Sequence, residues 1–172
     1  MKSKFLNPFL IAAASVFEQE VGVKVSRGRL SIQRGGYISD DVTVLVSLVG
    51  RVEGSVLFGM SYNTAKRIVS EVLGQEFERF DELAQSGIAE LANVISGLSS
   101  TKLAEVGYRS IISVPMLIIG KGSRISTPDI ERLIVPMGTP LGEVELSLIL
   151  RDNPQAPEQF ESLTTKVSAL TL

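Results

Sequence analysis

The chain has 172 residues, of which 44% are hydrophobic and 21% charged, and its net charge is −2. This size and composition fit one globular domain, and the scattered lysines and arginines form no basic stripe of the kind that binds nucleic acid. The sequence contains no cysteine and no histidine. Disulfides, thiol nucleophiles, imidazole bases and His/Cys metal sites are therefore excluded, so any chemistry depends on carboxylates, amides, hydroxyls or lysines.

The N-terminal segment supports two interpretations. Two lysines, an apolar stretch and three alanines resemble a secretory signal. Asn7 and Pro8, however, fit the cap and the first position of a helix, and Gly22 offers a stop. The apolar residues between them have helical spacing: Phe9, Ala13, Val16, Phe17 and Val21. We therefore expect a first helix in a mature, cytoplasmic protein, and no apolar run is long enough to span a membrane.

The next part of the chain predicts strands and a second helix. Residues 23–33 alternate roughly, and two glycines break the pattern at 35–36. Residues 41–50 are rich in β-branched side chains, and together with residues 54–61 they predict a hairpin. Ser61 is a suitable cap for a helix that ends at Gly74.

A long helix follows, over about residues 82–106, before Gly107. Strands are predicted at 110–120, 131–138 and 142–150, and the last of these alternates regularly between apolar and polar residues. Hairpins combined with a few long helices predict an antiparallel sheet packed by long helices, which is a two-layer α+β domain.

This domain is expected over residues 1–150, and residues 151–172 form a C-terminal tail. A loose tail and a short helix remain as alternatives for it, the helix burying Phe160, Leu163, Val167 and Leu170.

The long helix has two faces when its residues are placed at about 100° intervals. The face expected to pack on the sheet carries Ala84, Ile88, Leu91, Ala92, Ile95 and Leu98. The opposite face carries Glu82, Ser86, Glu90, Asn93, Gly97 and Ser100. A solvated surface is one interpretation of this second face. Asn is a poor residue for a helix interior, and the short side chains leave room for another molecule, which favours a site.

Ser86, Glu90 and Asn93, followed by Pro115, resemble the S-x-x-x-E-x-x-N signature of the CheC/CheX/FliY phosphatases of bacterial chemotaxis. "NPFLIAAASVFEQEVG" and "GRVEGSVLFGMSYNTAKRIVSEVLG" resemble the first helix and the central hairpin of CheX-type members. The resemblance covers most of residues 5–150 and implies a CheC-like fold. The first helix has no Glu-x-x-Asn of its own, so the chain looks like a single-site, CheX-like member.

The resemblance implies a phosphatase that hydrolyses the aspartyl phosphate of a phosphorylated CheY-type response regulator. Glu90 and Asn93 would be catalytic: Asn93 would orient the attacking water, and Glu90 would contact the partner's active-site lysine. Ser86, Gly97 and Pro115 would support the site or bind the partner. Pro115 fits a bulge or an edge strand equally well.

The resemblance further implies that the chain has no metal or cofactor of its own and that the response regulator carries Mg²⁺. The expected partners are a phosphorylated receiver domain and a second copy of the chain in a homodimer, but no nucleic acid and no membrane. Residues 142–150, as an edge strand, could join two sheets, although Glu143 and Glu145 would blunt that edge.

Two other functions remain as alternatives. One is a non-catalytic binding or scaffold module of the same fold in a chemotaxis, flagellar-switch or pilus system. The other is a small-molecule sensor with a pocket between sheet and helices, which an aromatic content of 6% supports little.

Overall fold

The computed structural model describes residues 3–127 and 130–157. Its helical elements are η1 (Ser3–Phe5), α1 (Leu6–Val16), the π-helical η2 (Phe17–Val21), α2 (Tyr62–Leu73) and α3 (Glu82–Glu105). Its strands are β1 (Ser26–Arg27), β2 (Ser31–Gln33), β3 (Tyr37–Ile38), β4 (Val42–Gly50), β5 (Val52–Met60), β6 (Ser110–Ile112), β7 (Met116–Ile119), β8 (Arg124–Ile125), β9 (Arg132–Thr139) and β10 (Gly142–Asp152).

One antiparallel sheet forms the centre of the molecule, with the strand order β1-β9-β10-β5-β4-β6. β2 also pairs with β9, and β7 also pairs with β4, while β3 and β8 form a separate two-stranded sheet. β10 is hydrogen-bonded to β9 on one side and to β5 on the other. The prediction that residues 142–150 form an edge strand able to join two sheets is therefore wrong, because both of its edges are occupied.

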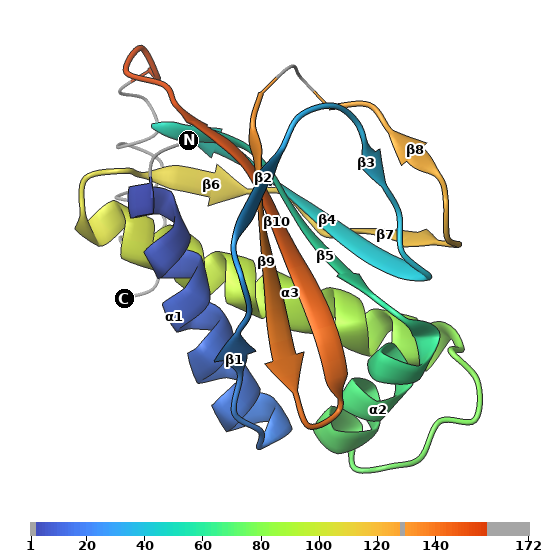
Figure 1. Cartoon of the computed structure of the whole chain (residues 1–172). Helices are drawn as coiled ribbons and strands as arrows, with labels where there is room; N and C mark the ends of the chain where they lie inside the picture. The colour runs from blue at the N-terminus through green and yellow to red at the C-terminus, as the bar shows by residue number, and fades with distance from the viewer. Residues whose placement is uncertain (1–2, 128–129, 158–172) are drawn as a thin grey trace.

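The three α-helices cover one face of this sheet, with α3 crossing it and α1 and α2 beside α3 (Figure 1). Every second residue of the central strands points into the core, which buries Val44, Val56 and Leu146 against helical residues such as Phe9 and Ile88. The predicted two-layer α+β fold is confirmed. Of the helices in the described part of the chain, none is long and apolar enough to cross a membrane.

The first helix begins at Leu6, two residues earlier than predicted. Asn7 lies inside α1 and is exposed, and Phe5, with helical φ and ψ of −83° and −21°, precedes the helix without a side-chain cap. The predicted Asn7 cap is wrong because the η1 turn already brings the backbone into helical geometry. The predicted apolar stripe is buried, and Gly22 ends the segment with a φ of 77°. The segment belongs to the core, which supports its interpretation as a helix of the domain.

Other boundaries follow the predictions with local differences. Ser61 caps α2 as predicted, accepting a hydrogen bond of 3.1 Å from the Thr64 backbone N–H. Residues 23–33 contain two short strands rather than one, because both β1 and β2 pair with β9. β10 continues to Asp152, two residues past the predicted end of the domain. The residues of the proposed C-terminal helix, Phe160, Leu163, Val167 and Leu170, lie outside the described residues.

Candidate functional site

α3 is the element that carries the predicted site. Asp81 caps it, since its carboxylate accepts a hydrogen bond of 2.9 Å from the Ala84 backbone N–H. Ile88, Leu91 and Ile95 are buried against the sheet, as predicted. Leu98 packs on the core but is only half-buried, because it lies at the margin of the buried stripe. The predicted register of the helix is thus correct, with Leu98 as a partial exception.

The opposite stripe of α3 places the predicted polar residues together. Ser86 and Glu90 are exposed, and Asn93 and Gly97 are half-buried. Because one uninterrupted helix holds these positions, Glu90 and Asn93 are on neighbouring turns with adjacent side chains. Within residues 3–127 and 130–157, no hydrogen bond or ion pair engages the side chains of Ser86, Glu90 or Asn93. Their polar groups are therefore available to another molecule.

β6 fixes the position of this stripe. The Ser100 hydroxyl donates a hydrogen bond of 2.6 Å to the carbonyl of Ser110, at the start of β6. A methyl group added at Gly97 would lie 3.8 Å from the Cδ1 atom of Ile112, at the end of β6. The half of α3 that follows Asn93 is thus held against β6 by the Ser100 hydrogen bond, in addition to the buried packing of Ile95 and Leu103.

Pro115 lies in a β-bulge between β6 and β7. Residues 113–115 stand opposite only two residues of β4, 46–47, so one extra residue loops out of the ladder. The Ser113 N–H donates to the Ser47 carbonyl at 2.9 Å, and the Ser47 N–H donates to the Ser113 hydroxyl at 3.0 Å. A proline without an N–H fits this interruption, so the bulge accounts for Pro115 structurally. In the described part of the chain, no hydrogen bond connects the bulge to Glu90 or Asn93.

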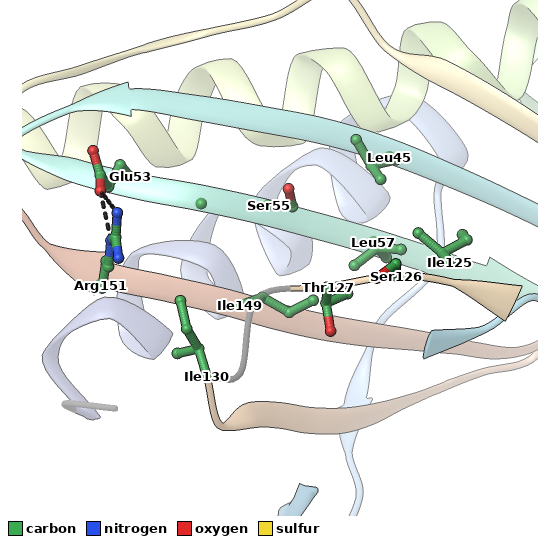
Figure 2. Close-up of a pocket in the computed structure, with 11 residues that line it drawn as sticks. Leu45, Glu53, Ser55, Leu57, Ile125, Ser126, Thr127, Ile130, Ile149 and Arg151 are labelled. Carbon is green, nitrogen blue, oxygen red and sulfur yellow. Dashed lines mark hydrogen bonds and ion pairs between the residues drawn. The ribbon is translucent and has the colours of Figure 1, made fainter. Parts of the chain in front are cut away.

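The opposite face of the sheet has a pocket of about 230 Å³ (Figure 2). Leu45, Leu57 and Ile149 form its floor, and the segment that contains Ile125 passes over them. This pocket lies on the sheet face away from the helices, which is not the place that the sensor hypothesis requires.

Glu53, at one end of this pocket, has a carboxylate that is bound by neighbouring side chains. Its carboxylate accepts hydrogen bonds from Arg151 and from the Asn153 amide, the latter at 2.9 Å. Both oxygens are therefore held by neighbouring strands. This engagement contrasts with the unengaged carboxylate of Glu90.

The site on α3 offers the Glu90 carboxylate, the Asn93 amide and the Ser86 hydroxyl. Among the described residues, no group of three or more His, Cys, Asp or Glu side chains is placed to hold a metal ion. An exposed amide can both donate and accept a hydrogen bond, so it can position a small molecule such as water. Such a site can promote a reaction only if a partner brings the reactive group.

Exposed aliphatic side chains beside Glu90 were not singled out by the sequence. Leu83 and Val94 are 52% and 38% exposed on α3. Their exposure could have been predicted from helical spacing, because neither Leu83 nor Val94 falls on the buried stripe that includes Ile88 and Ile95.

Comparison with known proteins identifies the family of the chain. The family model "Chemotaxis phosphatase CheX" matches residues 42–138, which is more than half of the chain. The fold is thus that of the CheC-like chemotaxis phosphatases. The chain belongs to the CheX family.

Individual relatives cover most of the chain. It is 27% identical over 128 residues to the CheY-P phosphatase CheX of Thermotoga maritima, covering 74% of this chain and 83% of the relative. The CheX–CheY–BeF3–Mg²⁺ complex from Borrelia burgdorferi has a chain with 30% identity and a TM-score of 0.76, covering 88% and 100% of the two chains. A CheC-like protein from Shewanella sp. PV-4 has a TM-score of 0.79 at 24% identity, over 88% and 99%.

Proposed function

We propose that the protein hydrolyses the aspartyl phosphate of a phosphorylated CheY-type receiver domain, with Asn93 orienting the attacking water. One observation carries the proposal: Glu90 and Asn93 stand on neighbouring turns of a fixed helix, and no described residue engages their side chains. The partner is taken from the relatives, one of which is a CheY-P phosphatase and another of which forms a complex with CheY. A cytoplasmic location is part of the same proposal.

Asn93 supplies positioning rather than acid–base chemistry. Its carbonyl oxygen would accept a hydrogen bond from the water, and its NH₂ group would donate one to a phosphoryl oxygen. Holding the water in line with the phosphorus removes much of the entropic barrier, as water-orienting residues do in phosphoryl transfer generally. An amide does not titrate, so this role should be nearly independent of pH.

Glu90 would fix the register of docking. It lies one turn before Asn93 and is exposed, so its carboxylate can extend toward the partner. We propose a charge-assisted contact with the active-site lysine of the receiver domain, which is stronger than a neutral hydrogen bond. Mg²⁺ is expected on the receiver, where it would neutralise charge on the phosphoryl oxygens. The Borrelia complex contains that ion together with CheY.

Ser86, Gly97 and Pro115 have supporting roles in the proposal. Ser86, one turn before Glu90, is exposed and would add a hydroxyl to the contact surface. Gly97, one turn after Asn93, would let the partner backbone approach α3. Pro115 would keep the bulge next to β6 in one conformation, because its ring fixes φ.

We also propose a homodimer, formed through the β6/β7 side of the sheet. Val49 and Ile111 are directly opposite each other on β4 and β6, and they are 50% and 51% exposed. Val114 and Met116 extend this apolar surface past the bulge. A contiguous exposed apolar surface of this kind is typical of an interface between proteins.

The test of the proposed function is a time course of phosphoryl loss from phosphorylated, Mg²⁺-loaded receivers of the source organism. Asn93→Ala should lower the stimulated rate roughly 10²- to 10³-fold, the scale for losing one well-placed polar group in a transition state. It should change stability by less than about 0.5 kcal/mol, because Asn93 makes no contact that folding depends on.

Glu90→Ala should behave differently, since it removes a docking contact. Its rate loss should shrink at saturating receiver, whereas the loss in Asn93→Ala should persist. Glu82→Ala, an exposed glutamate two turns earlier on α3, is the matched control and should leave the rate unchanged. Equal rates for wild type and Asn93→Ala would show that the α3 stripe is solvated surface and would favour the scaffold function.

A further inference from the structure

Three aliphatic side chains are exposed beside Glu90 on the helix layer. Leu73 lies at the end of α2 and is 42% exposed, and Leu83 and Val94 lie on α3. We refer to Leu73, Leu83 and Val94 as the aliphatic shelf. None of the three belongs to the buried core of the domain.

These residues form one surface for two reasons: Leu83 and Val94 lie on the same stripe of α3, and Gly87 on that stripe lets the Leu73 side chain approach it. Leu83, Gly87, Glu90 and Val94 follow one another at intervals of three or four residues, which places them along one stripe of α3. A methyl group added at Gly87 would lie 3.6 Å from the Cδ1 atom of Leu73. The Leu73 side chain therefore reaches the stripe between Leu83 and Glu90.

The stripe lies on the side of Glu90 that faces α2, whereas Asn93 lies on the side that faces β6. At a rise of about 1.5 Å per residue, Val94 is about 6 Å and Leu83 about 10 Å from Glu90 along the helix axis. A specific protein interface buries roughly 800 Å² of each partner. A partner domain of this kind that places a group at Asn93 therefore also covers Val94 and Leu83.

The composition of the shelf fits an interface. The exposed side of an amphipathic helix is normally polar, and aliphatic residues there leave apolar area in water that only a partner can remove. An apolar centre next to a few exact polar contacts is the usual anatomy of a protein–protein contact. Leu83 and Val94 enclose Glu90 from both directions along α3, so the proposed docking carboxylate lies within the apolar surface.

We propose that the aliphatic shelf binds an aliphatic surface of the receiver domain beside its phosphorylated aspartate, and that it determines affinity for the receiver. This inference rests on the proposed function, since continuity with Glu90 and Asn93 identifies the occupant. Asn93 then governs the rate of hydrolysis, and Leu83 and Val94 govern how tightly the receiver is bound.

The test uses Leu83→Gln and Val94→Thr, which keep the length or shape of each side chain and add polarity. Ile32→Gln on β2 is the matched control. Ile32 is an aliphatic residue that is 61% exposed, and it lies on a strand that pairs with β9, away from α2 and α3. Binding of each protein to a BeF3- and Mg²⁺-loaded receiver is measured by fluorescence titration, and KM and kcat are measured with the phosphorylated receiver. Each shelf variant should raise Kd and KM roughly 5- to 20-fold with kcat within about twofold, and the control should match wild type.

The outcomes separate this inference from the proposed function. An active wild type whose Kd and KM are unchanged in both shelf variants overturns the shelf and leaves the phosphatase proposal standing. A wild type that binds the receiver without hydrolysing it, with binding weakened in the shelf variants, supports the shelf and overturns the phosphatase proposal. Shelf variants that change the molar mass of the protein, and not its receiver binding, assign the surface to a second copy and overturn the inference.

Discussion

Asn93 and Glu90 differ in burial although they are only three residues apart. Asn93 is half-buried on the side of α3 next to β6, and Glu90 is exposed on the side next to the aliphatic shelf. Restricted surroundings limit the rotamers of a side chain, which suits a group that has to hold water in one position. A long exposed side chain retains its reach, which suits contact with a partner. At the scale of the residue, burial therefore agrees with the division of roles that we propose.

Gly97 gives a prediction at this scale. A methyl group there would make an ordinary contact with Ile112, so Gly97→Ala should stabilise α3 by about 0.5–1 kcal/mol through helix propensity. If the partner backbone approaches α3 at this point, the same variant should slow receiver dephosphorylation. Chemical unfolding and the phosphatase time course measure the two effects. A more stable variant with an unchanged rate would remove Gly97 from the contact surface.

At the scale of the element, long local patterns could be predicted and remote pairing could not. α3, α2 and the β4/β5 hairpin were predictable because caps, helical spacing and β-branched runs are all local. β1 and β2 are short because each pairs with a different part of β9, which is remote in the sequence (Ser26 pairs with Gly138 and Gln33 with Arg132), and no local pattern contains that information. The central place of β10 was missed for the same reason: alternation indicates a strand, not its neighbours.

The same contrast between local patterns and remote contacts applies to the residues of the site. Glu90 and Asn93 could be located because a family signature and one helix hold them together, whereas the aliphatic shelf required the contact between α2 and α3. The bulge at Pro115 was one of two readings of the sequence, and only the register with β4 decides between them.

Packing of α3 on the sheet gives a prediction for Leu91. Its side chain is 7% exposed, so Leu91→Ala should lower the free energy of unfolding by about 2–5 kcal/mol. Leu98→Ala is the control on the same helix and should cost less, because Leu98 is half-buried. Urea unfolding followed by circular dichroism measures both. A larger loss for Leu98→Ala would mean that the register of α3 on the sheet is wrong.

β10 gives a prediction for pH dependence. Burial raises the pKa of the Glu145 carboxyl, and the nearby charge of Asp40 raises it further. The folded state then binds this proton more tightly than the unfolded chain, so the free energy of unfolding falls as pH rises from the ordinary carboxyl range through the raised pKa.

Glu145→Gln, which stays neutral, should therefore raise Tm at about pH 7.5 and should change it little at about pH 4, where the carboxyl is protonated in both states. Glu143→Gln, on the same strand but exposed, should show a smaller difference between the two pH values. An equal gain in Tm at both pH values would contradict the assigned titration and would indicate a packing effect.

At the scale of the whole molecule, the proposed dimer surface and the proposed catalytic pair lie on different elements, and Pro115, a proposed supporting residue of the site, lies between Val114 and Met116 of the dimer surface. The apolar surface on β6 and β7 includes Ile111 and Met116, whereas Glu90 is on α3. Light scattering at tens of micromolar protein should give about twice the 18.6 kDa mass of one chain. Met116→Glu should reduce that mass toward one chain, because it places a charge on an apolar interface. Glu71→Ala on α2 is a control away from this surface, and a monomeric wild type would rule out the dimer.

Glu90 and Asn93 are not engaged by any other described side chain, and this has a consequence for how such a protein can change over generations. Enzymes that build their sites from strained or buried polar groups lose stability by keeping them and regain it when the sites decay. Here the pair costs the folded domain only the weak helix propensity of Asn93, on the order of a few tenths of a kcal/mol. Copies that have lost Asn93 should therefore persist as folded proteins that still bind the receiver, so an inactive descendant could differ from an active one at this position and nowhere in its architecture.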